Sequence, residues 1–361
     1  MKKQLLLELI QVAIEGRESL SKVPTKEEWQ YLYDEAIRQS LVGVLLSGVE
    51  RLYNKDVAFK PPMTILYEWV GCVIQIERKN RELNYAASLL HRIFKDGGLR
   101  SCVLKGQGLS TLYPKPQRRQ SGDIDLWVEG SREHTLCFLK KKFFDTGEVV
   151  IHHVDACIIE GVETEIHFLP SYTYNYLRYI KYKRFFKEES GEQFCHFDER
   201  IGFAYPTNRF NAVYLMLHIF RHVFHEGIGL RQFLDYYFVL LQLSEDERKW
   251  AYEKLEWLGL KNITGAVMYV LQNVFLLENS FLLCAPSQQR GSYLIAEIEQ
   301  GGNFGKYDER YKWIHGKGKI WLYIENLKRL RKVFSLCPSE VLWAFLWKPS
   351  HWIWRKYNGY V

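Results

Sequence analysis

Residues 121–130 read SGDIDLWVEG and place two acids one position apart in a run of strand-forming residues. Successive side chains of a strand point to opposite faces, so Asp123 and Asp125 share one face, while Ile124, Leu126 and Val128 are left for core positions. Two like charges side by side repel, and they need a cation, a shared proton or water to be stable. A divalent metal is the option among these that also does chemistry. The stretch therefore predicts a strand whose polar face binds metal.

A glycine turn precedes this strand. Residues 101–104 are predicted to form a short strand, followed by the turn KGQG and a helix from about Gly108. Gly106 and Gly108 would let backbone N–H groups approach a phosphate closely, and Lys105 would add a mobile positive charge. A lone K-G-x-G is more often a plain turn, so the prediction depends on the acids that follow.

A β-hairpin is predicted after the acidic strand. The runs VVIHHVDACII (149–159) and VETEIHFL (162–169) flank a Glu160-Gly161 turn. Glu165 and His167 fall on one face of the second run, and Glu165 would add a third carboxylate to the aspartates. Three strand carboxylates can hold two Mg²⁺ ions, one carrying the phosphates of a nucleotide and one activating a hydroxyl. His167 is expected either to contact a carboxylate or act as a base, or to be a structural histidine.

The composition limits the class of protein. The 361 residues are 47% hydrophobic and 25% charged, with a net charge of +7, which favours anionic substrates without indicating a nucleic-acid groove. Seven scattered cysteines fit reduced thiols in a cytoplasmic protein. The start, MKKQLLLELIQVAIEG, is predicted to be an amphipathic helix rather than a signal peptide. No stretch of the sequence approaches the length of a transmembrane segment.

Helical periodicity divides the chain into three predicted parts. These are an N-terminal helical lobe (1–95), an α/β core (96–205) and a C-terminal helical region (206–361) that ends in a basic, aromatic tail. The tail is expected to pack against the helical lobe rather than to touch a membrane surface or a partner protein. A glycine-rich loop is predicted near residue 300.

Polar residues interrupt the apolar helices of the C-terminal region. His218 and His222 lie one helical turn apart, and helix packing or substrate contact is favoured over metal binding because no third ligand is evident. Arg231 and Asp235 are also four residues apart, which indicates either a structural ion pair or substrate contact across a cleft. All four residues are expected near the mouth of a substrate cleft.

These segments together resemble a known family. VLKGQGLSTLYPKPQRRQSGDIDLWV, VETEIHF and GIGLRQFLDYYFVL are similar to the uncharacterised nucleotidyltransferase family of the polymerase-beta-like superfamily, over about residues 80–305. The resemblance implies that Asp123, Asp125 and Glu165 are the metal-binding and catalytic acids. It also matches Gly106 to the phosphate-turn glycine and Arg119 to a phosphate-neutralising arginine, for which an exposed arginine is the alternative. Gln107 departs from the family, which usually has Ser or Gly there.

The resemblance implies an α+β fold with a small mixed nucleotidyltransferase-like sheet, and Mg²⁺-dependent transfer of a nucleoside monophosphate from a nucleoside triphosphate. The expected acceptor is an unidentified hydroxyl. Two alternatives remain: an inactive nucleotide-binding or scaffolding protein, which Gln107 favours, and an antitoxin-like enzyme that modifies a partner protein.

Overall fold

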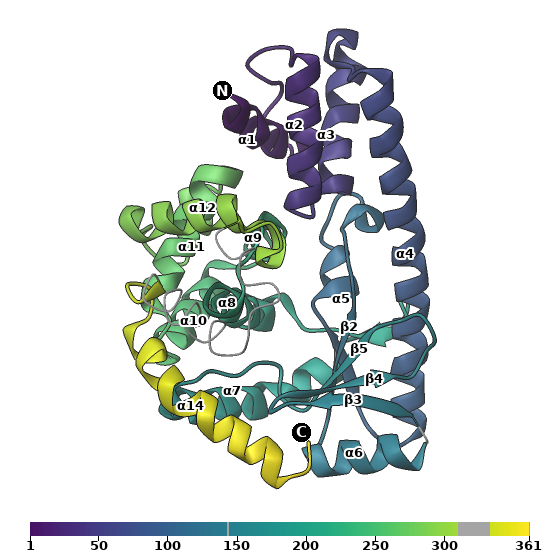
Figure 1. Ribbon diagram of the computed structural model, residues 1–361, viewed down its shortest axis with the longest axis vertical. Coiled ribbons are helices and arrows are strands. Elements are labelled where there is room, and N and C mark those ends of the chain that lie inside the picture. The colour runs from purple at the N-terminus through teal and green to yellow at the C-terminus, as the bar shows by residue number, and fades with distance from the viewer. Residues whose placement is uncertain (143, 310–332, 361) are drawn as a thin grey trace.

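The computed structural model describes residues 1–142, 144–309 and 333–360. Helices surround one small sheet, with the N-terminal helices at one end and α6 at the other (Figure 1). The α+β class with a small mixed sheet and helical regions at both ends of the chain is confirmed. The boundaries proposed at residues 95 and 205 remain a prediction.

Four helices form the N-terminal part. Thr25 caps the second of them, because its side chain accepts from the Glu28 backbone and the Glu28 side chain accepts from the Thr25 backbone. Ser40 has a φ of +55° at the break between the second and third helices. The helices are α1 (Lys2–Ala13), α2 (Lys26–Arg38), α3 (Val42–Lys55) and α4 (Met63–Asp96), with a 3₁₀ turn η1 (Val57–Phe59) before α4.

The sheet has the strand order β1-β2-β5-β4-β3. Its central pair, β2 and β5, is parallel, and the other three pairs are antiparallel. The strands are β1 (Ser101–Leu104), β2 (Ile124–Val128), β3 (Asp145–Val149), β4 (His153–Cys157) and β5 (Thr164–His167). The short helix α5 (Gly106–Ser110) and the turn η2 (Pro116–Arg118) connect β1 to β2, and α6 (Arg132–Lys141) connects β2 to β3.

The hairpin prediction is partly correct. β4 and β5 do pair antiparallel, but residues 158–163 connect them, instead of a two-residue turn. The first predicted run is divided between the end of β3 and β4. Its partner β5 also pairs with β2, which the sequence pattern did not show.

The two faces of the sheet differ in chemistry. Ile124, Leu126 and Val128 share one face and pack in a cluster with Leu83 and Leu90 of α4. The opposite face carries Asp125 on β2, and the register sets Glu165 of β5 beside it and Asp155 of β4 beside Glu165. Alternation along three strands thus gathers carboxylates on the face that is turned away from α4.

In the part of the C-terminal half that the structure describes, the elements are helical apart from a two-stranded ribbon. The buried apolar residues of its helices belong to the same core cluster as those of α1–α3, so the N-terminal and C-terminal helices share one core. The elements are α7 (Tyr176–Cys195), β6 (Phe197–Asp198), β7 (Phe203–Ala204), α8 (Asn208–His225), α9 (Leu230–Leu241), α10 (Glu245–Trp257), α11 (Lys261–Phe275), η3 (Asn279–Phe281), α12 (Gln288–Gly301), η4 (Asn303–Gly305) and α14 (Pro338–Tyr357).

The basic, aromatic tail lies partly outside the described residues, which omit 310–332. Its described helix α14 contacts the segment after β5 and the β3 side of the sheet, since Trp347 stacks on Tyr172 and Arg355 pairs with Glu148. The expectation that the tail packs on the N-terminal lobe is therefore wrong for α14. No helix in the described part of the chain is long and apolar enough to cross a membrane.

Candidate functional site

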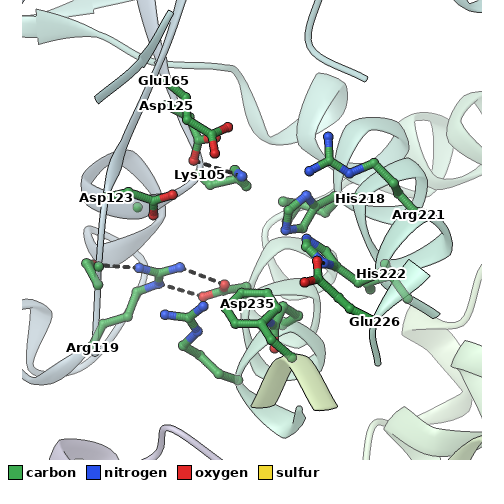
Figure 2. Close-up of a pocket in the computed structure, with 18 of the residues that line it drawn as sticks. Lys105, Arg119, Asp123, Asp125, Glu165, His218, Arg221, His222, Glu226 and Asp235 are labelled. Carbon is green, nitrogen blue, oxygen red and sulfur yellow. Dashed lines mark hydrogen bonds and ion pairs between the residues drawn. The ribbon is translucent and has the colours of Figure 1, made fainter. Parts of the chain in front are cut away.

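A cavity of about 410 Å³ lies between the polar face of the sheet and helices α8 and α9. Figure 2 shows Asp125, Glu165 and Lys105 facing His218, Arg221 and His222 across it. The predicted site residues that line the cavity are Lys105, Gly106, Arg119, Asp123, Asp125, Glu165, His218, His222, Arg231 and Asp235. The expected cleft therefore brings together residues that the sequence separates by more than 100 positions.

Asp125 and Glu165 form the centre of the acidic wall. His167 Nε2 lies 2.9 Å from Asp125 Oδ1 and 3.2 Å from Glu165 Oε2. Burial opposes ionisation of both acids, but Lys105 and His167 hold the pKa of Asp125 well below its usual value. The hydrogen bond from His167 likewise lowers the pKa of Glu165 to about 2, and the two acids raise the pKa of His167. Both carboxylates are thus ionised.

Asp123 stands apart from this cluster. It lines the same cavity. Among the described residues, however, it belongs to none of the groups of three potential metal ligands whose donor atoms all lie within 4.8 Å of one another. The charge of Asp125 raises the pKa of Asp123, and burial adds to this effect. The repulsion expected from the sequence is therefore present, and it acts on Asp123.

The turn after β1 brings a cation to the acids. Lys105 Nζ lies 2.8 Å from Asp125 Oδ2. Lys105 and Gly106 have φ values of +51° and +37°, so two successive residues occupy the region that side chains disfavour. Gly106 lines the cavity, and a Cβ there would meet nothing closer than the Asp123 carbonyl oxygen at 3.9 Å. The backbone of the turn is therefore open to the cavity.

The other two residues of the turn face elsewhere. Gly108 is not in the cavity lining, and a Cβ there would lie 2.7 Å from Cβ of Tyr205, so this glycine permits close packing. Gln107 is buried, and its amide donates to Asn84 Oδ1 of α4 at 2.8 Å. The residue that departs from the family pattern thus contacts α4, and the cavity is left unobstructed.

Arg119 is buried, so the exposed arginine considered as an alternative is not what the structure shows. Its Nε and Nη2 donate to the two carboxylate oxygens of Asp235 at 2.7 and 2.8 Å, and Nη1 donates to Ser121. Tyr113 donates to the same carboxylate. This paired, buried guanidinium connects the segment between η2 and β2 to α9.

Arg231 does not pair with Asp235, so the structural ion pair, one of the two alternatives that the sequence left open, is not what the structure shows. Its Nη1 donates to the Gln120 carbonyl at 2.6 Å and its guanidinium lies over Phe304, while its Nε is buried with no partner among the described residues. The neighbouring helix adds Arg221, whose Nη1 lies 2.5 Å from His152 Nε2. Sequence reasoning missed Arg221, although its place one residue before His222 was a usable signal.

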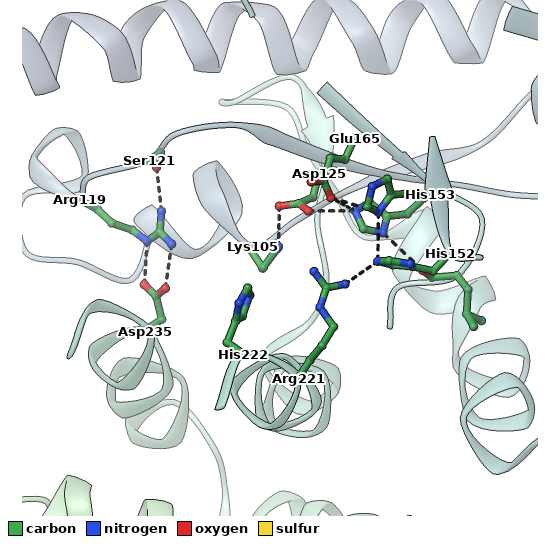
Figure 3. A network of polar contacts seen from close by, with 12 residues as sticks. Lys105, Arg119, Ser121, Asp125, His152, His153, Glu165, Arg221, His222 and Asp235 are labelled. Carbon is green, nitrogen blue, oxygen red and sulfur yellow. Dashed lines mark hydrogen bonds and ion pairs between the residues drawn. The ribbon is translucent and has the colours of Figure 1, made fainter. Parts of the chain in front are cut away.

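The imidazoles divide between the two walls. His152 and His153 lie behind Glu165, with His153 Nδ1 3.4 Å from Glu165 Oε2, and connect it to Arg221 (Figure 3). His218 and His222 lie on α8, and His222 Nδ1 is 2.8 Å from Glu226 Oε1. Burial lowers the pKa of His153 and of His222 to about 4, and it holds the pKa of His152 and of His218 well below the usual value of a histidine. These four rings are neutral at physiological pH.

The residues present fit a divalent cation. Asp125 and Glu165 offer carboxylate oxygens, which are the ligands that Mg²⁺ prefers, and His167 Nε2 lies within 4.8 Å of them. His167 would become a ligand only after Nε2 releases the proton that it donates to the two acids. The raised pKa of Asp123 shows an excess of negative charge that a cation would relieve. His153 and Asp155 extend the donor set away from the cavity centre.

Comparison with known proteins adds one match. The model of a family described as uncharacterised nucleotidyltransferase matches residues 25–275, which covers α2 to α11 and includes both walls of the cavity. No curated protein and no solved structure matches the chain.

Proposed function

Because the chain belongs to the uncharacterised nucleotidyltransferase family, we propose that it transfers a nucleoside monophosphate from a nucleoside triphosphate to an acceptor hydroxyl, with Mg²⁺ as the metal. Asp123, Asp125 and Glu165 would hold the metal. When bound, Mg²⁺ would neutralise charge on the phosphates and on the attacking oxygen.

The observation that carries the proposal is the arrangement of charged groups around the cavity. The sheet wall presents the carboxylates of Asp123, Asp125 and Glu165, with Lys105 paired to Asp125. The helical wall presents Arg221 and Arg231, and its two carboxylates already have partners: Asp235 pairs with Arg119, and Glu226 with His222. A metal ion on the sheet wall and the two arginines opposite would together contact a triphosphate from both sides. Arg231 is suited to a phosphate because its planar donors include one buried N–H that has no partner among the described residues.

The other residues around the cavity would position the acids and the phosphates. Lys105 holds the Asp125 carboxylate, and the open backbone at Gly106 allows close approach of phosphate oxygens. Arg119 and Asp235 join the segment before β2 to α9, on opposite sides of the cavity. In-line displacement at phosphorus depends mainly on such positioning and charge neutralisation.

The test is transfer of label from a mixture of the four α-phosphate-labelled ribonucleoside triphosphates into components of a cell extract. We expect transfer that requires Mg²⁺ and falls at least about 100-fold in Asp125→Asn, because metal charge stabilisation contributes several kcal/mol to such reactions. Transfer by Asp125→Asn at the wild-type rate would place the chemistry elsewhere. Binding of triphosphate without any transfer would instead support the nucleotide-binding alternative.

A further inference from the structure

His222 and Glu226 form a histidine–carboxylate pair on the helical wall, across the cavity from Lys105 and Asp123 (Figure 2). His222 Nδ1 lies 2.8 Å from Glu226 Oε1. An ionised carboxylate only accepts hydrogen bonds, so Nδ1 carries the proton, and Nε2 of the neutral ring keeps its lone pair. The pair therefore fixes the tautomer in which Nε2 is the basic nitrogen.

Nε2 of His222 is a buried nitrogen that faces the cavity unpaired, as far as the described residues show. The residue is only 5% exposed and lines the cavity, yet no group in residues 1–142, 144–309 or 333–360 forms a hydrogen bond with this nitrogen. An unpaired buried polar atom costs roughly 1–3 kcal/mol, so native structures seldom keep one without a use. A hydroxyl group of a ligand in the cavity would satisfy it.

The glycine-rich loop that follows α12 holds the ring in place. The ring of Phe304 lies 4.9 Å from that of His222, and Phe304 has a φ of +54°. Gly305, with a φ of +66°, packs so closely on the Glu226 carbonyl that a Cβ would come within 2.0 Å of the oxygen. The loop predicted near residue 300 thus packs on the ring of His222 and on the backbone of Glu226.

We propose that His222 is the general base that deprotonates the acceptor hydroxyl, and that Glu226 is its positioning residue. The inference rests on the proposed nucleotidyl transfer. Nε2 accepts the hydroxyl proton, the acceptor oxygen forms a bond to the α-phosphorus, and the bond from that phosphorus to the bridging oxygen breaks. Pyrophosphate leaves with the bonding electrons, and the imidazolium later releases its proton to water.

Charged and titratable groups surround His222 on every side. Glu226 and Arg221 adjoin it on α8 together with His218, whose ring lies 4.2 Å away; Lys105 faces it from the sheet and Arg231 from α9. Burial and the cations lower the pKa of His222, and Glu226 opposes this. The base is thus unprotonated at neutral pH.

The first experiment measures labelled transfer with the four-triphosphate mixture and extract. We expect His222→Ala to lose at least about 100-fold in transfer while retaining binding of a non-hydrolysable triphosphate, since general bases contribute about 10²–10⁴-fold. Added imidazole should restore part of the transfer by His222→Ala and none of that by Asp125→Asn. His225→Gln is the matched control on the same helix, because His225 contacts Tyr172 and Tyr174 outside the cavity.

The second experiment follows the pH profile of Glu226→Gln. Removing the carboxylate charge lowers the pKa of His222 further, so the acid limb of the profile should move to lower pH, and transfer at pH 7 should fall about 10-fold. A purely structural role for Glu226 would reduce the rate and leave the limb in place.

The outcomes separate the two proposals. If the wild-type protein transfers label but His222→Ala stays within about threefold of it, or imidazole gives no rescue, the general-base assignment is overturned and the proposed function stands. If the wild-type protein transfers no label, the proposed nucleotidyl transfer is rejected, and the assignment of His222 as its general base is rejected as well.

Discussion

At the scale of single residues, the two aspartates of GDIDL have opposite environments. Asp125 is buried between Lys105 and His167. Asp125→Asn should lower the free energy of unfolding by roughly 3–5 kcal/mol, because it leaves the positive charges of Lys105 and His167 without the carboxylate that they share. Asp123 is repelled by Asp125, so Asp123→Asn should slightly raise the melting temperature of the metal-free protein. Urea and thermal unfolding in EDTA measure the stability of the two variants. Equal changes of the same sign in Asp123→Asn and Asp125→Asn would contradict the different environments assigned to the two aspartates.

The candidate site residues that the sequence indicated are those that share one face of a strand or match a family motif. Asp123, Asp125 and Glu165 could be identified because strand alternation and a family motif coincide there. Arg221 and Glu226 were missed because a charge at the end of an apolar helix is usually solvated, and only the packing of α8 against the sheet turns them towards the cavity. Asp235 lines the cavity, but its partner is Arg119, 116 positions earlier, which no local pattern indicates.

At the scale of elements, local patterns predicted the helices better than the strand pairing. Helical periodicity predicted that residues 1–95 are helical, although it did not separate α2 from α3. β3 was missed, because its sequence, DTGEV, contains an aspartate and a glycine that strands disfavour. The parallel pairing of β2 with β5 joins residues about 40 positions apart and places Glu165 beside Asp125. Such pairing depends on tertiary contacts, which a periodicity argument does not contain.

The packing of α5 against the ribbon gives a test at this scale. Gly108→Ala would place a Cβ 2.7 Å from Cβ of Tyr205, so we expect a loss of about 1–3 kcal/mol in the free energy of unfolding. Gly71→Ala is the control: it lies within α4 with nothing near the new Cβ, and it should stabilise the protein by roughly 0.5–1 kcal/mol. Urea denaturation compares the two, and a neutral Gly108→Ala would reject the packing role.

At the scale of the whole molecule, the buried histidines link stability to pH. His91, His152, His153, His218 and His222 all have lowered pKa values, chiefly because of burial. The unfolded chain takes up protons below about pH 6.5 and the folded chain resists them, so the free energy of unfolding should fall as the pH drops from 7 to 5. His167 opposes this trend, because its pKa is raised and its contribution is greatest at low pH.

His91 lies away from the cavity, and its Nδ1 is 3.2 Å from Ser101 Oγ. It therefore tests how one buried histidine makes stability depend on pH. His91→Gln should make the fall in the free energy of unfolding between pH 7 and 5 smaller than in the wild-type protein. His134→Gln, at an exposed position on α6, should leave the fall unchanged. Urea denaturation at several pH values in EDTA measures the slope, and an unchanged slope in His91→Gln would contradict the assignment.

Long-range contacts also determine how the tail is held, and this could not be read from the sequence. Glu340 of α14 is 3% exposed and accepts hydrogen bonds from Thr173 Oγ1 and the Tyr174 backbone at 2.5 Å, and from the Asn175 backbone at 3.3 Å. These residues connect β5 to α7. Tyr174 in turn contacts His225 at the end of α8. One carboxylate thus ties α14 to the segment that borders the helical wall.

Glu340→Ala would leave three buried donors without an acceptor, so we expect a loss of about 2–5 kcal/mol in the free energy of unfolding. Faster amide hydrogen exchange at residues 173–175 should accompany this loss even under conditions where the protein stays folded. Leu342→Ala is the control, since Leu342 lies on the same helix with 61% exposure and should change neither quantity. Unaltered exchange at 173–175 in Glu340→Ala would show that α14 is held by its aromatic contacts alone, because Trp347 would still stack on Tyr172 and contact Tyr174.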